Sequence, residues 1–247
     1  LKILEEKGIH LIEDVCEAHG AEFGGRKLGT FGLASNFSFY FAHHLSTIEG
    51  GMICTGDEDF HQTVLMMRSH GLVREATSEA LKQEYARKHP DLAPDFMFAF
   101  PSFNFRNTEI GAVLGRSRLK HLERGNARRK RNFKLFLEHL DPEKYRTGFD
   151  LRGSCNYALN LVLRRPDSGL RDRVESTLLK CGVEFRRGSS GGGNQLRQPY
   201  LKPLLPEGEY LKYPEVEHLH FYGYYIGNYP DLEEGKILAL CGLLNRL

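Results

Sequence analysis

Short apolar blocks alternate with polar ones over the first sixty positions of the chain. Apolar residues recur at helical spacing over 1–7, and the run HLIEDV (10–15) that follows has the character of a short buried strand. The segments NFSFYF (36–41) and GMICTG (51–56) have the same character, and glycine-rich turns separate the blocks. Helix–strand alternation of this kind predicts α/β layers.

Longer helical patterns follow. Residues 57–71 (DEDFHQTVLMMRSHG) form an amphipathic pattern, with Asp57 or Asp59 available as N-cap. Residues 72–102 are polar and irregular, which predicts a long loop of the kind that often forms lids or subunit contacts.

One or two long helices are expected over residues 106–140, with Thr108 as the N-cap. The basic run RRKR (128–131) lies inside this pattern. We expect it to be a solvated helix face, because the net charge of the chain stays close to zero.

After residue 140 the pattern changes. A strand (157–165), an amphipathic helix (168–183) and a terminal helix (231–247) predict a second, smaller α/β domain. We therefore expect two domains, residues 1–140 and residues 141–247.

Composition narrows the classes of partner. The chain has 247 residues, is 40% hydrophobic and 27% charged, and carries a net charge of +2. So balanced a charge argues against nucleic acid or an anionic membrane as the main partner. No apolar run approaches the ~18 residues of a membrane-spanning helix.

Five widely separated cysteines bear on metal sites and on the compartment. They form no CxC or CxxC pair, so neither a zinc site nor an iron–sulfur cluster is expected. Scattered thiols are typical of a reducing cytoplasm, which is the location that we expect. They are Cys16, Cys54, Cys155, Cys181 and Cys241.

Three groups of residues carry chemistry. The strand that runs into Glu13-Asp14 places a carboxylate at its carboxyl end, the edge at which open α/β sheets bind ligands. In NFSFYFAHHLSTIEGG (36–51), Ser38 offers a hydroxyl, the paired glycines allow close backbone approach, and His43 offers an imidazole suited to proton transfer.

The third group is PSFNFRNTEIGA (101–112). Asn104 and Arg106 alternate with aromatic residues, so on an extended segment their side chains point the same way and can reach a phosphate or carboxylate. Taken alone, the three groups indicate an α/β protein with a phosphate-bearing ligand.

Four motifs together resemble a known family. IEDVCEAHGA (12–21), SFYFAHHLSTIEGGM (38–52), RSHG (68–71) and FNFRNTEIGA (103–112) follow the order and spacing of the DegT/DnrJ/EryC1/StrS sugar aminotransferases, which use pyridoxal phosphate. The resemblance implies a PLP-dependent transferase-like α/β fold (aminotransferase fold type I) and a homodimer with shared active sites. The chain resembles about the C-terminal two-thirds of such an enzyme.

The domains and several site residues take roles from this resemblance. Residues 1–140 resemble the C-terminal part of the large PLP-binding domain with its connecting helix, and residues 141–247 resemble the small C-terminal domain. Of the cofactor-binding positions, Asp14 matches the partner of the pyridine nitrogen, Glu17 lies by the ring and Ser38 binds the phosphate. The other matched residues are Asn104, which reaches the phosphate from the neighbouring subunit, and Arg106, on the substrate side.

His43 stands where the family's aminotransferases have a lysine. It lies five residues after Ser38, and no lysine occurs between Lys27 and Lys82. A histidine cannot form the Schiff base that this lysine makes, but it can carry a proton. The change marks the 3-dehydratase branch of the family, with His43 as the catalytic residue; His44 is assigned only packing or a hydrogen bond.

The branch implies the remaining partners. They are pyridoxamine or pyridoxal 5'-phosphate, a nucleotide-linked 4-keto-6-deoxy sugar of deoxysugar or lipopolysaccharide biosynthesis, and glutamate as amino donor. Some enzymes of the branch carry an iron–sulfur cluster and others do not. Because this chain has no CxC or CxxC pair, we expect an enzyme without a cluster. Asn194, Arg197 and Gln198 are expected to face the sugar or its nucleotide, with arginine as a diphosphate clamp. Two alternatives stay open: a lysine-free sugar aminotransferase, and an inactive homologue that binds a nucleotide sugar.

Overall fold

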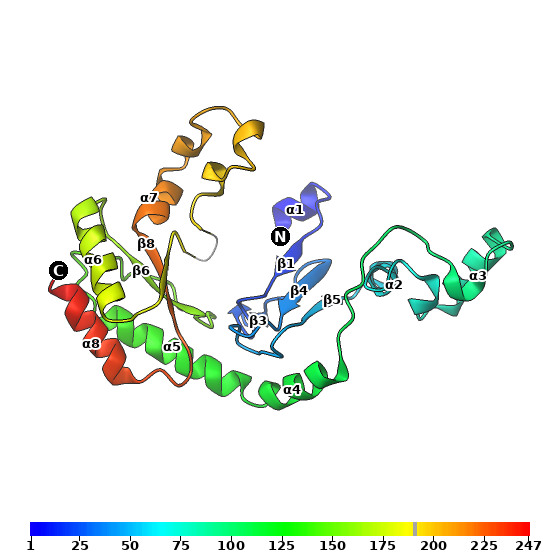
Figure 1. Ribbon diagram of the computed structural model, residues 1–247, viewed down its shortest axis with the longest axis horizontal. Coiled ribbons are helices and arrows are strands. Elements are labelled where there is room, and N and C mark those ends of the chain that lie inside the picture. Colours follow the sequence, from blue (N-terminus) through cyan, green and yellow to red (C-terminus); the bar gives the residue numbers. More distant parts are fainter. Residues whose placement is uncertain (190–191) are drawn as a thin grey trace. The chain divides into compact units, whose positions relative to one another are not determined.

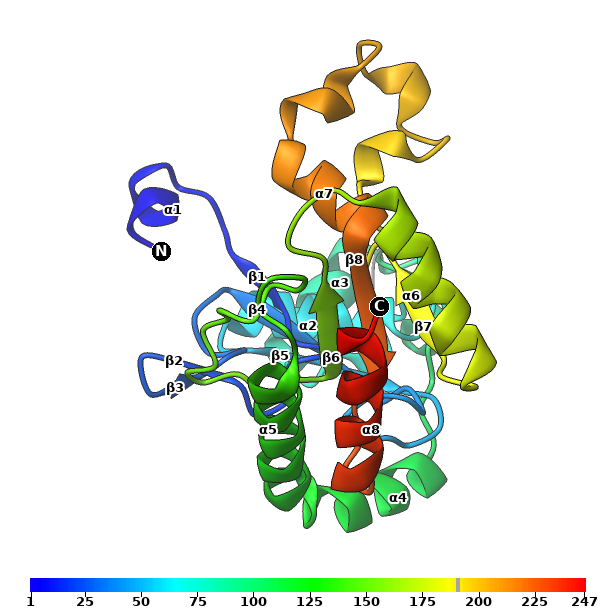
Figure 2. The same cartoon turned by 90° about the vertical axis from the view of Figure 1, so that its left-hand side faces the viewer.

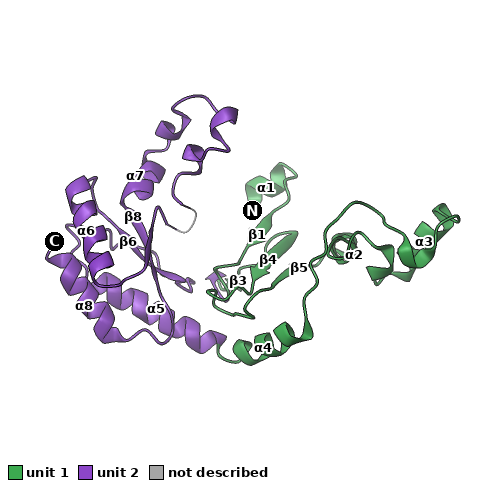
Figure 3. Ribbon diagram, in the orientation of Figure 1, with its two compact units in different colours: residues 1–19, 23–121 green, residues 20–22, 122–247 purple. Residues whose placement is uncertain are grey.

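The chain forms two compact units. The structure is a computed structural model and describes residues 1–189 and 192–247. The first unit comprises residues 1–19 and 23–121, and the second comprises residues 20–22 and 122–247 (Figure 3). The long helix that we expected to close the first domain thus belongs to the second unit by its contacts. The domain boundary at residue 140 stays a prediction.

A three-stranded sheet organises the first unit. Strand β1 (Ile12–Asp14) pairs in parallel with β4 (Ala34–Ser38), and β4 pairs antiparallel with β5 (Gly51–Thr55), as Figure 1 shows. β1 and β5 lie inside the segments predicted as strands, whereas β4 overlaps the predicted segment 36–41 only over residues 36–38 and begins two residues before it. Strands β2 (Glu22–Phe23) and β3 (Arg26–Lys27) form a separate two-stranded ribbon.

The connection from β3 to β4 is held by one carboxylate. Glu13 accepts hydrogen bonds from the backbone N–H groups of Gly29, Phe31 and Gly32, at 2.6, 2.6 and 2.9 Å. These bonds lower the pKa of Glu13 against the opposing effect of burial, since they favour its charged form. Side chains alternate along a strand, so Glu13 serves the fold while the next residue, Asp14, points to the other face.

Four helices belong to the first unit. The predicted cap residues are confirmed: the Asp57 side chain accepts from the N–H of Phe60 at 2.8 Å, and that of Thr108 accepts from Gly111 at 3.4 Å. A small core of Met66, Val73, Ala76 and Met97 lies beside the second helix. The helices are α1 (Lys2–Glu6), α2 (Glu58–Met67), α3 (Glu79–Lys88) and α4 (Glu109–Leu119), with 3-10 turns at Val73–Glu75 and Pro94–Phe96.

The prediction that residues 72–102 form an irregular loop is wrong for α3. None of its residues is fully buried, and its apolar face is narrow, with Leu81 and Tyr85 partly buried one turn apart against the small core. Ser78 caps the helix by accepting from the N–H of Leu81 at 3.2 Å, and the pair Lys88–Glu84 closes at 2.5 Å across one turn.

The second unit packs three helices against an antiparallel sheet. The sheet order is β6-β8-β7, and Figure 2 shows α5, α6 and α8 on one face of it, with α5 and α8 side by side. The strands are β6 (Ala158–Val162), β7 (Phe185–Arg187) and β8 (Gly223–Gly227). The helices are α5 (Leu122–His139), α6 (Ser168–Lys180), α7 (Pro214–Tyr222) and α8 (Glu234–Asn245), with 3-10 turns at Gln195–Arg197, Lys202–Leu204 and Glu209–Lys212.

The larger hydrophobic core lies between these helices and the sheet. Phe136, Leu161, Val174 and Leu244 are all fully buried there, one from each of α5, β6, α6 and α8. Each supplies roughly 1.5–3 kcal/mol of burial free energy. In the part of the chain that the structure describes, no helix has the length and apolar character needed to cross a membrane.

The basic run 128–131 is not a uniformly solvated face as we expected. Arg129 is only 7% exposed and donates hydrogen bonds from Nη1 to the carbonyl oxygens of Asn228 and Tyr157. Burial lowers the pKa of its guanidinium. Arg131, by contrast, is an exposed partner of Glu234, at 3.0 Å.

We expect Arg129→Met to lower the free energy of unfolding by about 2–3 kcal/mol, because it leaves buried carbonyl groups without their donor. The measurement is urea unfolding followed by circular dichroism. Arg131→Met is the matched control and should cost less than about 1 kcal/mol, as exposed ion pairs do. Equal losses in both variants would contradict the buried role of Arg129.

Candidate active site

Two parallel strands bring the first four predicted site residues to one edge of the sheet. Asp14 is the last residue of β1 and Ser38 the last residue of β4. Because the strands are parallel, their carboxyl ends lie at the same edge. The turns that leave these ends carry Glu17 and His43, so local strand pairing alone places all four residues together.

Asp14 is exposed at this edge and is held as a carboxylate. Its Oδ1 accepts hydrogen bonds from the backbone N–H of Cys16 and from Nδ2 of Asn36, both at 3.1 Å. The thiol and N–H of Cys16, followed by Asn36 and the positive charge of His43, hold the pKa of Asp14 below its ordinary value. An ionised carboxylate at a strand end can accept a charge-assisted hydrogen bond from a protonated ring nitrogen of a ligand.

His43 lies beside Glu17. Its Nε2 is 3.9 Å from Oε1 of Glu17, and its side chain is 12% exposed while that of Glu17 is 43% exposed. The ring of Tyr40 packs edge-on against the imidazole, with centroids 5.5 Å apart. A mostly sheltered imidazole with a carboxylate within ion-pair distance is an arrangement that can take up and release a proton.

Ser38 points its hydroxyl at the turn after β4. Its Oγ accepts from the N–H of Tyr40 at 3.3 Å, which leaves the hydroxyl hydrogen able to donate. Across the sheet Ser38 pairs with Gly51, and the preceding Gly50 has a φ of +144°. A Cβ on Gly50 would lie 2.9 Å from Oγ1 of Thr47, so the close approach of the backbone requires glycine.

The same turn stores backbone strain at Ile48. This residue has a φ of +75° although it is β-branched, and its side chain is 66% exposed. A left-handed conformation costs such a residue roughly 1–2 kcal/mol, and no burial of the side chain offsets the cost.

Ile48→Asn should therefore raise the free energy of unfolding by about 1 kcal/mol, since asparagine adopts the left-handed region far more readily. Chemical denaturation of both proteins measures the change. Ile53→Asn, on β5 with 51% exposure, is the control and should destabilise instead. A loss of stability in Ile48→Asn would show that the turn needs the isoleucine side chain.

His19 is a member of this region that sequence reasoning missed. It is 4% exposed, and its ring lies 5.6 Å from Phe37 and 5.9 Å from His44 between centroids. Burial, with the charge of His43, lowers the pKa of His19 to about 4, so it stays neutral near pH 7. His44 thus packs on a buried neutral ring, in keeping with the packing role assigned to it.

Asn104 and Arg106 lie on the extended segment before α4, where their recorded partner is Ser69. Asn104 forms an antiparallel bridge with Ser69, and Nη2 of Arg106 lies 3.5 Å from its Oγ. Both residues are exposed, and their recorded contacts do not join them to Asp14 or His43. Their roles at the phosphate and the substrate stay predictions.

Asn194, Arg197 and Gln198 lie in the second unit, in and around the 3-10 turn Gln195–Arg197. Asn194 is 1% exposed and donates from Nδ2 to Glu217 at 2.8 Å. Arg197 forms a two-pronged pair with the same carboxylate, at 2.8 and 2.5 Å, and its guanidinium lies 3.9 Å over the ring of Tyr210. Their predicted contact with a sugar nucleotide is untested, and residues 190–191 of the predicted glycine-rich loop lie outside the described residues.

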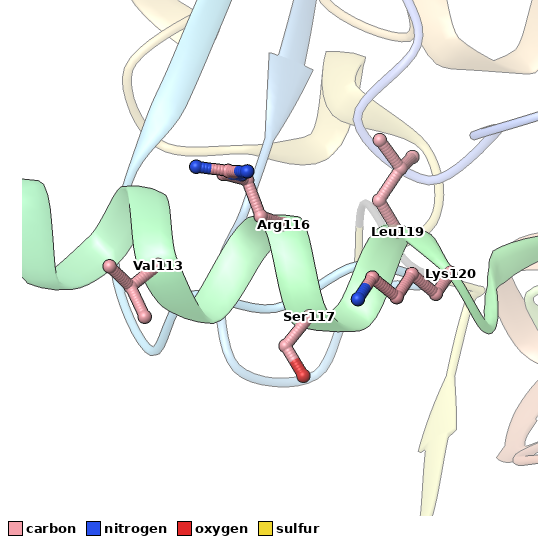
Figure 4. Close-up of a pocket in the computed structure, with 5 residues that line it drawn as sticks. All are labelled: Val113, Arg116, Ser117, Leu119 and Lys120. Carbon is pink, nitrogen blue, oxygen red and sulfur yellow. The ribbon is translucent and has the colours of Figure 1, made fainter.

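A shallow open pocket lies elsewhere in the first unit, on α4. Figure 4 shows its lining side chains projecting from this one helix, and none of the predicted site residues is among them. The lining consists of Val113, Arg116, Ser117, Leu119 and Lys120. An open groove on one exposed helix lacks the convergent polar groups of a catalytic site.

The order of motifs and the geometry at the strand ends agree with a comparison against known families. The family model described as "DegT/DnrJ/EryC1/StrS aminotransferase family" matches residues 1–190. The chain belongs to this family. The predicted resemblance to this family is confirmed.

Individual relatives of the family are similar over nearly the whole chain. The GDP-4-keto-6-deoxy-D-mannose 3-dehydratase of Yersinia pseudotuberculosis is 30% identical over 99% of this chain and 62% of its own. The enzyme of the same name from Escherichia coli O55:H7 is 28% identical over 92% of this chain and 58% of its own. The chain thus spans about three-fifths of the length of these relatives.

A solved structure confirms the predicted fold class. The E. coli GDP-4-keto-6-deoxy-D-mannose-3-dehydratase with bound hydrated PLP superimposes with a TM-score of 0.78 at 27% identity, covering 98% of this chain and 62% of that one. The DegT/DnrJ/EryC1/StrS chain described here therefore has the α/β fold of PLP-dependent aminotransferases.

Proposed function

We propose that the protein containing this chain is a pyridoxamine-phosphate-dependent 3-dehydratase, which removes the C3 hydroxyl of a nucleotide-linked 4-keto-6-deoxy sugar. One observation carries the proposal: His43 occupies the position five residues after Ser38, beside Glu17 at the strand-end edge, with no lysine between Lys27 and Lys82. A site of this family without a lysine cannot hold its cofactor covalently there, but it retains a proton carrier.

The similar relatives support the substrate class. Both enzymes named above are 3-dehydratases of GDP-4-keto-6-deoxy-D-mannose, and they match the chain across its two units. We extend to this protein only the class, a nucleoside-diphosphate-linked 4-keto-6-deoxy hexose, because the chain spans about three-fifths of their length.

The residues at the strand ends fit pyridoxamine phosphate. Asp14 offers an ionised carboxylate for the ring nitrogen, and Ser38 offers a hydroxyl hydrogen for the phosphate. Glu17, in the turn after β1 and 3.9 Å from His43, would flank the ring. When bound, the cofactor would supply an amine for the sugar's ketone and an electron-withdrawing ring.

His43 performs the proton transfers in this proposal. Its imidazole would take a proton from the cofactor carbon that bears the amine and would give a proton to the C3 hydroxyl of the sugar, which would leave as water. The carboxylate of Glu17, with Oε1 3.9 Å from Nε2 of His43, holds the imidazole in place. The packed ring of Tyr40 limits access of water to one side of His43.

The remaining assignments complete the proposal. We assign Asn104 to the cofactor phosphate across a homodimer, and Arg106, Asn194, Arg197 and Gln198 to the substrate. Glutamate is the proposed amino donor, and no iron–sulfur cluster takes part. The five scattered cysteines, which form no CxC or CxxC pair, favour the cytoplasm, and deoxysugar synthesis for lipopolysaccharide is the proposed setting.

A second function is favoured by the family itself, whose description is that of an aminotransferase. A lysine-free aminotransferase would replace the ketone oxygen of the sugar by an amino group and would leave the C3 hydroxyl in place. An inactive nucleotide-sugar-binding homologue is the third reading, and it predicts binding without turnover.

Product analysis decides among the three. The protein expressed from its complete reading frame is incubated with pyridoxal phosphate, glutamate and GDP-4-keto-6-deoxymannose, and the sugar product is identified by mass spectrometry. Loss of the C3 oxygen supports the proposal. An amino sugar supports the aminotransferase, and an unchanged sugar that still protects the protein against heat supports the binding homologue.

A further inference from the structure

The Asp14 carboxylate is braced from its own turn and from the neighbouring strand. The N–H of Cys16, two residues on, and Nδ2 of Asn36 both reach Oδ1 at 3.1 Å. Asn36 is also the residue opposite Asp14 in the parallel pairing of β1 and β4, and its carbonyl accepts from the N–H of Val15 at 2.9 Å. The backbone of the sheet thus fixes both ends of the contact.

The thiol of Cys16 joins the same cluster. Nδ2 of Asn36 lies 3.2 Å from Sγ of Cys16, and the thiol can donate to the carbonyl oxygen of Asn36, 4.0 Å from Sγ. The thiol also contributes to the lowered pKa of the neighbouring Asp14 carboxyl group. Both Cys16 and Asn36 are half-buried, whereas Asp14 is exposed. Two donors, the N–H of Cys16 and the amide of Asn36, therefore converge on one carboxylate oxygen, with the thiol of Cys16 beside them.

Charge and burial make the thiol a donor rather than a nucleophile. Burial, then the hydrogen bond and charge of Asp14, raise the pKa of Cys16 to about 11, with a smaller contribution from Glu17. At neutral pH the thiol keeps its proton, which it can share with the carboxylate. The effect is mutual, because the same contact lowers the pKa of Asp14.

The geometry leaves one carboxylate oxygen for a ligand. The backbone N–H and the Asn36 amide both bind Oδ1, so neither occupies Oδ2. We propose that Cys16 and Asn36 are positioning residues, which hold Asp14 ionised and oriented through Oδ1 and leave Oδ2 to bind the protonated ring nitrogen of the cofactor. This inference rests on the proposed function for the identity of that cofactor.

The first test needs no cofactor. Alkylation of Cys16 by iodoacetamide is followed by peptide mapping at pH 9, with the exposed Cys181 as internal reference. In Asp14→Asn the rate at Cys16 should rise about tenfold, the effect of one pKa unit. Glu17→Gln, which removes only a nearby charge, should raise it less than about threefold. A rate in Asp14→Asn within twofold of the natural protein would overturn the proposed coupling.

The second test reads Asp14 itself. The protein labelled with 13C at aspartate carboxyl groups is titrated by NMR. Cys16→Val and Asn36→Leu should each move the Asp14 midpoint to higher pH, and Cys16→Ser, which restores a donor, should return it close to the natural value. Asp14 midpoints that coincide in Cys16→Val and Cys16→Ser would overturn the role of the thiol. If the valine variant does not fold, the alkylation result decides.

The third test links the cluster to the cofactor. Binding of pyridoxamine phosphate is measured by fluorescence between pH 3 and pH 8. As the pH falls towards 4, Cys16→Val should lose affinity at a higher pH than the natural protein, because the pKa of Asp14 returns towards its ordinary value of about 3.9, while Cys16→Ser should keep the natural profile. Superimposable profiles for Cys16→Val and the natural protein would overturn the positioning role. If the natural protein binds no pyridoxamine phosphate, the proposed function fails, and with it the assignment of Oδ2, while the alkylation result still reports the coupling.

Discussion

His43→Asn should reduce the turnover number of 3-dehydration by about 10²–10⁴-fold, the contribution typical of a positioned proton carrier. Asparagine preserves much of the volume and a polar end, so the half-buried turn can keep its conformation while proton transfer is lost. The measurement is kcat in the complete enzyme with a saturating nucleotide-linked keto sugar. The Michaelis constant should change far less than kcat, because the imidazole acts on the reacting atoms rather than on binding.

His61→Asn is the matched control, since it removes an imidazole from the exposed side of α2 in the same unit. It should leave kcat unchanged. His44→Asn tests the neighbouring position, and its packing on buried His19 predicts an effect mainly on stability. Full dehydratase activity in His43→Asn would falsify the catalytic assignment.

Strand pairing explains why much of the site was predictable from the sequence. Asp14 and Ser38 each follow a short apolar run, and parallel strands necessarily bring their carboxyl ends to one edge. His43 was recognisable because it stands at a fixed distance from Ser38 where a lysine is expected. The topological rule predicts where these residues lie, whereas their roles come from the resemblance to the family and stay predictions.

The partners of Asp14 were not predictable in the same way. Asn36 meets Asp14 only through the register of β1 and β4, which spans 22 residues of sequence, and no local pattern fixes that register. The sequence does not distinguish Cys16 from the other cysteines, because its proposed role depends on its contacts with Asp14 and Asn36 and not on a spacing motif. The burial of His19 against the ring of Phe37 likewise depends on tertiary packing, which the sequence pattern does not reveal.

The two wrong predictions of local structure, at α3 and at Arg129, arise because hydrophobic periodicity and composition do not identify which single side chains are buried. Helix α3 buries only a narrow, partly exposed face with Leu81 and Tyr85, so its amphipathic signal is weak and the cap at Ser78 is needed to indicate it. Arg129 lies within a basic run, yet one turn of α5 points it at the carbonyl groups of Asn228 and Tyr157. Composition described the run as a whole and could not separate its one buried member.

His43→Lys should convert the site from one that holds its cofactor without a covalent bond to one that binds it covalently. A lysine at this position restores the residue that the family's aminotransferases carry five positions after the serine. With pyridoxal phosphate, the variant should develop an absorption band of a protonated imine. After borohydride reduction, the mass of the peptide containing residue 43 should increase by that of the reduced cofactor.

The natural protein should show neither the band nor a reducible lysine adduct, because no lysine lies between Lys27 and Lys82. His44→Lys provides the control for an amine placed one residue away: His44 packs on His19, whereas His43 lies against Glu17 at the edge that Asp14 and Ser38 form. The adduct should therefore be confined to position 43. A lysine adduct in the natural protein, or equal labelling at positions 43 and 44, would contradict the assignment of His43 to the site of the missing lysine.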